Sequence, residues 1–448
     1  MNYKKLLQPY HVDMLDALRR FVQIPSVYDQ STVTKEMPFG KDVDKALKYV
    51  AELGERFGFD VDLCDGYATE LTIGEGKKTI GIYAHADVVP VTGDWDNPPF
   101  SPVIKDNNIY GRGTSDDKGP MIAAFFAVKA LKDAGMIRDY KIKIVVGGDE
   151  ERGSSCLEYY FDTLKKEGPT FGFTPDSDFP LIYGEKEIID FWPELDVDIP
   201  HVKSIKGGVA TNAVCDKVEV ELDDASEFVK YLNGKGIKHE ANGNKVLVIG
   251  KACHGSTPEL GENAALIVLE SLGNVYNVPV IKNIGEKLQD TTGKSFGCYS
   301  HSDLLKDTTY CVGIISYENS HLKFSVNFRY PETVKYQEIM ALFDEEFSTK
   351  SLAKGEPSHY LLYDPKSKLV STLLKAYRAE TGDNSEPLTT GGGTYAKHAK
   401  NTIAFGALFP GRVSTMHEPN EYMPLDDFYL SAVIYAHAID LLGKLDEN

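Results

Sequence analysis

Histidine and acidic side chains gather in five short stretches of this 448-residue sequence. Imidazole and carboxylate groups are the ligands by which many proteins hold divalent cations. The stretches are YAHADVVP (83–90), GRGTSDDKG (111–119), DEERG (149–153), TPDSDFP (174–180) and MHEPNE (416–421). Each stretch alone has an ordinary explanation as a turn, a core histidine, a helix N-cap or a solvated acidic loop. Their combination is what indicates a functional site.

The spacing within two of these stretches is typical of a site at the end of strands. Residues two apart on a strand face the same side, so His85 and Asp87 could serve one site. A carboxylate beside a metal-binding histidine commonly fixes the orientation of its ring. The acids 149–151 directly follow an apolar strand, at the point where open α/β sheets collect ligands. Three adjacent acids repel each other unless a proton or a cation intervenes.

The other stretches supply further carboxylates and a second imidazole. Asp116 lies between glycines before a predicted helix, Asp176 and Asp178 follow a short apolar run, and His417 comes late in the chain. Two histidines with three carboxylates, one of them bridging, form a nitrogen and oxygen ligand set suited to two close divalent ions.

The elements that must position these groups are predicted from hydrophobic periodicity. In the first part of the chain, the patterns predict helices at 12–23, 43–57 and 120–134, and buried strands at 79–89 and 141–147. Strand, helix and strand in this order indicate an α/β domain, with a mainly parallel sheet and helices on both faces.

The pattern of predicted strands and helices changes after residue 184, and the earlier pattern returns near residue 363. Alternating strand patterns dominate the middle part, mixed with helical patterns at 225–234, 262–273 and 334–348. Helices at 365–380 and 425–442, with a short strand at 402–408, then resume the earlier pattern. We therefore predict a discontinuous catalytic domain (1–184 and 363–448) with an inserted α+β lid domain (185–362).

The charge balance narrows the choice of partners. Lys plus Arg number 48 and Asp plus Glu number 67, a net charge of −19. A net negative charge of this size repels phosphate backbones and anionic membranes, so neither nucleic acid nor a membrane is an expected partner. No apolar run reaches the roughly 20 residues of a membrane span, the N-terminus lacks a signal pattern, and the cysteines are scattered. A cytoplasmic location is expected.

The five stretches resemble the motifs of the M20 family of metallopeptidases, in its aminoacylase and glutamate-carboxypeptidase group. They occur in the family's order and spread over nearly the whole chain. Three further stretches resemble the bacterial dipeptidases of the PepV type: GEKE after PDSDFP, CHGSTPELGENA (253–264) and TTGGGTYAK (389–397).

The resemblance implies two divalent metal ions per chain, with zinc as the first expectation and manganese or cobalt as alternatives. The implied ligands are His85, Asp116 and Asp176 for one ion, and Asp116, Glu151 and His417 for the other. Asp116 would bridge the two ions, and Asp87 would steady His85. In the fourth stretch, Asp178 is the alternative to Asp176.

The resemblance also implies a reaction and its remaining participants. A metal-activated water would cleave a dipeptide with a free C-terminal carboxylate, with Glu150 as general base. His254 would stabilise the oxyanion from the lid, which would close over the catalytic domain. The residues implied in binding the substrate carboxylate are Asn212, Arg329, Gly392, Gly393 and Thr394. The long insertion favours a monomer.

Two other functions remain open from the sequence. An N-acyl-amino-acid deacylase or a carboxypeptidase of the same family would also cleave an amide beside a free carboxylate. A non-catalytic protein that binds amino acids or metals is a third reading, although all presumed ligands and Glu150 are present.

Overall fold

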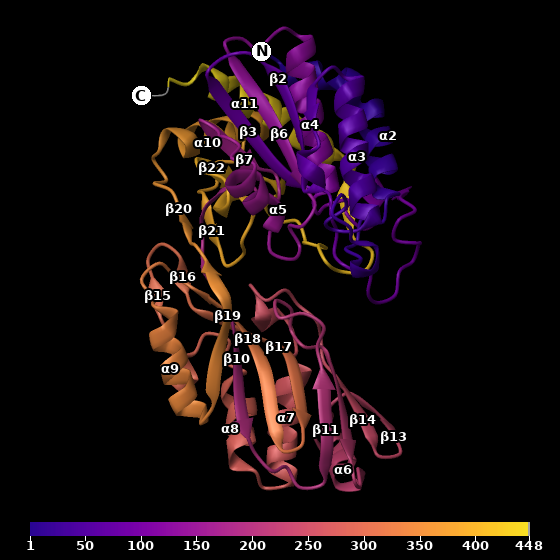
Figure 1. Ribbon diagram of the computed structural model, residues 1–448, viewed down its shortest axis with the longest axis vertical. Coiled ribbons are helices and arrows are strands. Elements are labelled where there is room, and N and C mark those ends of the chain that lie inside the picture. Colours follow the sequence, from indigo (N-terminus) through magenta and orange to yellow (C-terminus); the bar gives the residue numbers. More distant parts are fainter. Residues whose placement is uncertain (447–448) are drawn as a thin grey trace. The chain divides into compact units, whose positions relative to one another are not determined.

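The computed structural model describes residues 1–446, which divide into two compact units (Figure 1). Unit 1 consists of Met1–Tyr183, Leu362–Leu388 and the chain from Thr394 onward, and unit 2 of Gly184–Leu361 and Thr389–Gly393. The predicted limits at 184/185 and 362/363 lie within one residue of these boundaries. One difference is the glycine-rich segment 389–393, which groups with unit 2 and not with the rest of the C-terminal part. The catalytic and lid roles of the two units stay predictions.

Unit 1 is built on a mixed β-sheet with the strand order β1-β2-β6-β3-β7-β22-β9-β20, and β21 also pairs with β9. The strands are β1 (Asp60–Asp62), β2 (Ala68–Gly74), β3 (Lys78–His85), β6 (Tyr140–Gly147), β7 (Phe171–Thr174), β9 (Ile182–Glu185), β20 (Leu361–Leu362), β21 (Leu388–Thr390) and β22 (Thr402–Ala404). The central strands β6, β3, β7 and β22 are parallel, whereas β1, β2 and β9 run antiparallel to their neighbours.

The prediction of a mainly parallel sheet is therefore correct for the centre and wrong for the flanks. A helix connects β3 to β6, and a connection of that length permits parallel strands. Strands β1 and β2 are separated only by the short turn Cys64–Gly66, which forces them to be antiparallel. The predicted strand at 79–89 also ends earlier, at His85.

Helices cover both faces of this sheet. They are α1 (Tyr3–Leu7), α2 (His11–Val22), α3 (Lys41–Arg56), α4 (Lys118–Asp133), α5 (Ser155–Glu158), α10 (Lys368–Thr381) and α11 (Leu425–Lys444). The predicted helices at 12–23, 43–57, 120–134, 365–380 and 425–442 are thus present. Two small sheets complete the unit, one of β4 (Val103–Lys105), β5 (Asn108–Tyr110) and β24 (Tyr422–Pro424), the other of β8 (Ser177–Asp178) and β23 (Ala407–Leu408).

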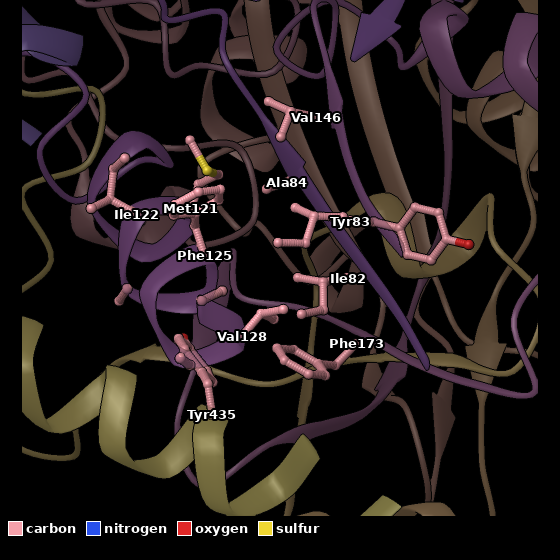
Figure 2. Close-up of a cluster of buried hydrophobic side chains, with 14 of the residues drawn as sticks. Ile82, Tyr83, Ala84, Met121, Ile122, Phe125, Val128, Val146, Phe173 and Tyr435 are labelled. Atoms are coloured by element: carbon pink, nitrogen blue, oxygen red, sulfur yellow. The ribbon is translucent and has the colours of Figure 1, made fainter. Parts of the chain in front are cut away.

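Alternation along β3 shows how the core is divided (Figure 2). Ile82 and Ala84 point toward α4, while Tyr83 points to the opposite face. On that opposite face the Tyr83 ring lies 5.9 Å from the ring of Phe161, in the helical segment after α5. Helix α4 is buried along most of its length between the sheet and other helices, and only Lys129, Lys132 and Asp133 near its end reach the surface, which fits its sequence PMIAAFFAVKAL.

Unit 2 has an antiparallel sheet with the order β13-β14-β12-β11-β17-β18-β10-β19. Its strands are β10 (Glu187–Asp196), β11 (Val202–Gly207), β12 (Lys217–Leu222), β13 (His239–Asn242), β14 (Lys245–Ile249), β17 (Thr309–Glu318), β18 (His321–Tyr330) and β19 (Lys350–Ser358), with the small pair β15 (His301–Ser302) and β16 (Lys306–Asp307). Its helices are α6 (Ser226–Lys235), α7 (Ala264–Val275), α8 (Pro279–Lys287) and α9 (Tyr336–Phe347). Sheet and helices share one hydrophobic core, separate from that of unit 1.

Among residues 1–446, no helix is both long and apolar enough to cross a membrane. All six cysteines are free thiols, five of them buried. The cytoplasmic location stays a prediction.

Replacing Phe125 with alanine should lower the free energy of unfolding of unit 1 by about 3–5 kcal/mol, because it opens a cavity in the core. Phe125 has no exposed surface, and its ring lies 5.2 Å from that of Phe59. In a Trp192→Phe background, Trp95 fluorescence reports the urea unfolding of unit 1 alone. The exposed-site control Val12→Ala should change the stability by less than about 0.5 kcal/mol. A comparably small loss for Phe125→Ala would contradict this packing.

Candidate metal centre

The carboxyl ends of β3, β6 and β7 lie at one edge of the parallel part of the sheet. His85 is the last residue of β3, Glu150 and Glu151 lie in the loop after β6, and Asp176 lies in the loop after β7. Parallel strands end on the same side, so their loops place these groups together. The predicted convergence of imidazole and carboxylate groups at this edge is present.

Two groups of ligand atoms form there, and Asp116 belongs to both. His85, Asp116 and Asp176 make one group, and Asp116, Glu151 and His417 make the other, with the ligand atoms of each group within 4.8 Å of one another. Asp116 Oδ1 lies 3.0 Å from His85 Nε2, and Asp116 Oδ2 lies 2.9 Å from His417 Nε2. Each oxygen of one carboxylate therefore faces one imidazole.

The remaining carboxylates complete the two groups. Asp176 Oδ2 lies 3.6 Å from His85 Nε2, and Glu151 Oε2 lies 3.1 Å from His417 Nε2. Asp178, the alternative ligand, belongs to neither group and lies instead in β8, paired with β23. The geometry favours Asp176 over Asp178.

Burial and charge shift the proton affinities of these groups in opposite directions. Burial acts to raise the pKa of Asp116, but hydrogen bonds with His417 and His85 outweigh it and hold the pKa below its usual range. Burial likewise acts to lower the pKa of His85, yet its carboxylate neighbours raise it well above the usual value. The surrounding carboxylates thus strongly favour the protonated form of the histidines, and they would also stabilise any other positive charge at this place.

The other acids of the site hold protons more tightly than free carboxyls do. Burial, together with the charge of Asp116, raises the pKa of Asp176 to about 7. Burial also raises the pKa of Glu150 well above its usual value, and that of Glu151 less strongly. Several carboxylates in one buried place are costly to ionise together without a compensating cation.

These observations fit a pair of divalent cations. The donors are imidazole nitrogens and carboxylate oxygens, the set that zinc, manganese and cobalt accept. Glu151 Oε1 is buried and has no hydrogen-bond partner within the described part of the chain. A cation beside it would satisfy this atom and offset the repulsion among the acids.

Asp87 contacts both His85 and the loop after β6. It lies beyond the end of β3, and its main-chain oxygen, not its carboxylate, is 2.9 Å from His85 Nδ1. The nearer carboxylate oxygen is 3.5 Å from the same nitrogen. Its two carboxylate oxygens instead accept the main-chain N–H groups of Glu150 and Glu151, each at 3.1 Å. Asp87 therefore holds both His85 and the loop that carries the presumed base.

His417 reaches the site from a loop between β23 and β24. Its backbone has φ of 64°, in the left-handed region that side chains other than glycine seldom adopt. Strain of this kind is retained where the surroundings fix the conformation, and it concentrates at functional sites.

Sequence reasoning assigned no role to Asp117 and Lys118, which follow the shared ligand. Asp117 Oδ2 accepts the main-chain N–H of His85 at 3.1 Å. The buried ammonium of Lys118 donates to the main-chain oxygens of Ile24 (2.7 Å) and Phe21 (3.2 Å), and burial lowers its pKa to about 7. A lysine directly before the apolar run 120–128 of a helix is the sequence signal that could have revealed it.

In unit 2, the structure brings the predicted oxyanion donor His254 into one region with the predicted substrate-binding residues Asn212 and Arg329. The N–H of Gly255, next to His254, donates to Asn212 O at 2.7 Å. Gly255 packs closely against Asn327, since a Cβ atom at position 255 would lie 3.2 Å from Asn327 Oδ1. The same oxygen accepts a hydrogen bond from Arg329 Nε at 2.8 Å. His254 itself is exposed, and its Nδ1 lies 2.6 Å from Ser256 Oγ. Their roles toward a substrate stay predictions.

The glycine-rich stretch is divided between the units. Arg329 Nη1 donates to Gly391 O at 2.7 Å within unit 2, which also contains Gly392 and Gly393. Thr394 belongs to unit 1, where its hydroxyl oxygen accepts the N–H of Ala396 at 3.2 Å and caps a short helix. The substrate contacts predicted for Gly392, Gly393 and Thr394 stay predictions.

Together, the mixed α/β fold and the paired ligand groups define the class of metal-dependent hydrolases. The model of peptidase family M20/M25/M40 matches residues 81–441. This chain belongs to that family, whose members are metal-dependent peptidases. A Staphylococcus haemolyticus protein named "Putative dipeptidase" is 36% identical over 465 residues, covering 98% of each chain.

Two solved structures share the fold over almost their entire length. Human carnosine dipeptidase 1 matches with a TM-score of 0.63 at 15% identity, covering 99% of each chain. An M20 family metallo-carboxypeptidase from Sulfolobus solfataricus matches with a TM-score of 0.60 at 20% identity, covering 96% of this chain and 99% of the other. At these identities the likeness establishes the fold.

Asp149→Asn should stabilise the metal-free protein at pH 7. Asp149 is buried, and burial raises the pKa of its carboxyl from 3.8 to about 6. The folded state thus favours the protonated form, so the carboxylate costs stability above pH 6, and this cost declines as the pH falls from 6 toward 4. We expect a gain of about 1–2 kcal/mol at pH 7 that shrinks by half or more at pH 4.5.

Thermal unfolding followed by circular dichroism at the two pH values measures this difference. The amide keeps an acceptor for Ser155 Oγ, which lies 2.5 Å from Asp149 Oδ2. The exposed-site control Asp94→Asn should leave the midpoint nearly unchanged at both pH values. A gain that is independent of pH would contradict the assignment to burial of the charge.

Proposed function

We propose that this chain is a dinuclear metallodipeptidase that hydrolyses dipeptides with a free C-terminal carboxylate. The observation that carries the proposal is the position of Asp116, whose two oxygens face His85 and His417 separately. A carboxylate placed between two imidazoles, each with a second acid beside it, suits a ligand that bridges two close cations. The dipeptidase name of the 36% identical relative supports the substrate class.

The residues proposed to hold the cations are those of the two ligand groups. His85, Asp116 and Asp176 would hold one cation, and Asp116, Glu151 and His417 the other. When bound, the two cations supply positive charge that brings the pKa of a water molecule toward neutrality and stabilises charge developing on the substrate carbonyl. Zinc is the proposed metal, with manganese and cobalt as the alternatives that metal reconstitution would separate.

Glu150 is the proposed general base. It is adjacent to the ligand Glu151, and its main chain is anchored by Asp87. Its carboxylate accepts a proton from the attacking water and passes that proton to the leaving amine. Burial raises the pKa of Glu150 well above its usual value, so this buried carboxylate binds a proton more readily than an exposed one does.

Unit 2 is proposed to supply the groups that recognise the substrate. Arg329 is buried, and burial lowers the pKa of its guanidinium only to about 10, so it remains charged at neutral pH. A charged guanidinium can pair with the substrate carboxylate. Asn212 and the segment 391–394 would add hydrogen bonds, and His254 would donate to the oxyanion. The protein is proposed to act as a monomer, in keeping with its long inserted unit.

Glu150→Gln should greatly slow turnover and leave metal binding intact. We expect kcat to fall by about 10²–10⁴-fold, because the amide cannot accept the proton. Metal content, measured by atomic emission after dialysis, should stay at two per chain. The matched control Glu158→Gln removes an exposed acid from the next helix and should keep wild-type kcat. Wild-type turnover by Glu150→Gln would refute the assigned base.

A four-substrate panel tests the substrate class directly. Alanyl-leucine should be cleaved, and its C-terminal amide should be cleaved at least about 100-fold more slowly, since the buried guanidinium of Arg329 would lose its partner. Alanyl-alanyl-leucine and N-acetyl-leucine complete the panel. Turnover of N-acetyl-leucine without turnover of alanyl-leucine would replace the proposal with a deacylase, and release of leucine from the tripeptide alone would indicate a carboxypeptidase. Metal binding without hydrolysis of any substrate would indicate a binding protein.

A further inference from the structure

Glu421 places a fully buried carboxylate directly behind the shared ligand. Its side chain has no exposed surface, and five donors surround its two oxygens. Oε2 accepts from Arg112 Nη1 at 2.8 Å and from the N–H of Gly113 at 2.9 Å. Oε1 accepts from the N–H of Ser115 at 2.8 Å, from its hydroxyl at 3.0 Å, and from the N–H of Asp116 at 3.2 Å. One carboxylate thus holds the loop that ends in the shared ligand.

A strand pair delivers Glu421 to this loop. Strand β24 pairs antiparallel with β5, with Tyr422 opposite Tyr110. Next to this pair of residues, the N–H of Gly111 donates a hydrogen bond to Glu421 O at 2.9 Å. Gly113 has φ of 89°, a conformation that glycine adopts without strain, and this turns its N–H toward the carboxylate. The backbone of the loop thus directs the N–H groups of residues 113, 115 and 116 toward the Glu421 carboxylate.

Arg112 makes the arrangement dependent on charge as well as on hydrogen bonds. Its side chain is only 1% exposed, and its Nη1 pairs with Glu421. Its Nε and Nη2 atoms have no hydrogen-bond partner among the described residues 1–446, although the guanidinium lies 5.2 Å from the ring centroid of Trp95. A buried guanidinium is strongly destabilised when its carboxylate is removed. An amide at position 421 would therefore disturb the loop more than the loss of one hydrogen bond suggests.

The same short segment provides His417 and Glu421. His417 contacts Asp116 Oδ2 from the side of the ligands, and Glu421 accepts the N–H of Asp116 from the side of the backbone. Asp116 is consequently held at both ends by residues four positions apart. A shift of the 416–421 segment would move one ligand directly and the shared ligand indirectly.

We propose that Glu421 is a positioning residue of the metal centre, which sets the place of Asp116 through the main chain of residues 113–116. This inference rests on the proposed dinuclear centre. Glu421 touches neither substrate nor cation in this role, and it acts only through Asp116. Partners that orient metal ligands typically alter metal affinity or activity by about 10–100-fold when they are removed. Because Asp116 belongs to both ligand groups, displacing it should weaken both sites together.

The test is Glu421→Gln, compared with wild type and with Glu418→Gln. Glu418 is exposed and lies in the same segment, so its variant removes the same charge without entering the loop. Calorimetric titration of the metal-free proteins with Co²⁺ should show binding about 10–100-fold weaker for Glu421→Gln only. The visible absorption bands of bound Co²⁺ should change in shape in that variant, because they report coordination geometry. A role in folding alone would leave these bands unaltered.

Steady-state kinetics with saturating metal supply a second readout. We expect kcat of Glu421→Gln to fall at least about tenfold while KM changes by less than about threefold, since substrate contacts are untouched. Wild-type Co²⁺ affinity and band shape in Glu421→Gln would overturn the inference. So would equal losses in Glu421→Gln and Glu418→Gln.

A milder variant covers the case in which Glu421→Gln does not fold. Ser115→Ala removes one donor to Oε1 and leaves the carboxylate and Arg112 in place. It should weaken Co²⁺ binding by about two- to fivefold, the range expected for one hydrogen bond to a charged group that is partly compensated. Unchanged Co²⁺ affinity in Ser115→Ala would then overturn the inference. If wild type itself binds fewer than two Co²⁺ ions, the proposed dinuclear centre fails instead, so the two failures are distinct.

Discussion

The sharing of one carboxylate between two imidazoles is the interaction on which this structure depends. Asp116 faces His85 with one oxygen and His417 with the other, and further acids lie beside each histidine. Buried carboxylates at such density repel each other strongly, and neutral side chains cannot relieve that repulsion. The fold is therefore arranged around a place where positive charge is required, and its loops are shaped to keep the acids there.

The parallel centre of the unit 1 sheet is what makes this density attainable. Strands β3, β6 and β7 end at one edge, so His85 at the end of β3 lies near Glu151 and Asp176 in the loops after β6 and β7. The last residue of β3 and the loop after β6 are then held by main-chain hydrogen bonds to buried carboxyl groups, since Asp117 accepts the N–H of His85 and Asp87 accepts those of Glu150 and Glu151. The sheet and these buried hydrogen-bonded side chains together fix the ligands more closely than loops alone could.

Much of the fold and the candidate site could be predicted from sequence, because the signals are local. Apolar periodicity places α4 and β6, and acids after strand ends indicate where Glu151 and Asp176 gather. The antiparallel pairs β2·β6 and β9·β22 could not be predicted, since pairing between strands distant in sequence leaves no local trace. The contacts of Asp87 with the 150–151 loop were missed for the same reason. The assignment of His417 came from the family resemblance, because no spacing rule links it to the sheet.

The order of the ligands along the chain has a consequence for biosynthesis. His85, Asp116, Glu151 and Asp176 all precede unit 2, whereas His417 follows it. As the ribosome extends the chain, one ligand group is complete before unit 2 is translated, and the other waits for the segment that carries His417. Cation binding at the second group would therefore require that His417 has been synthesised and that its segment has docked onto unit 1. A nascent chain released before residue 417 would retain one group whole and lack the imidazole of the other.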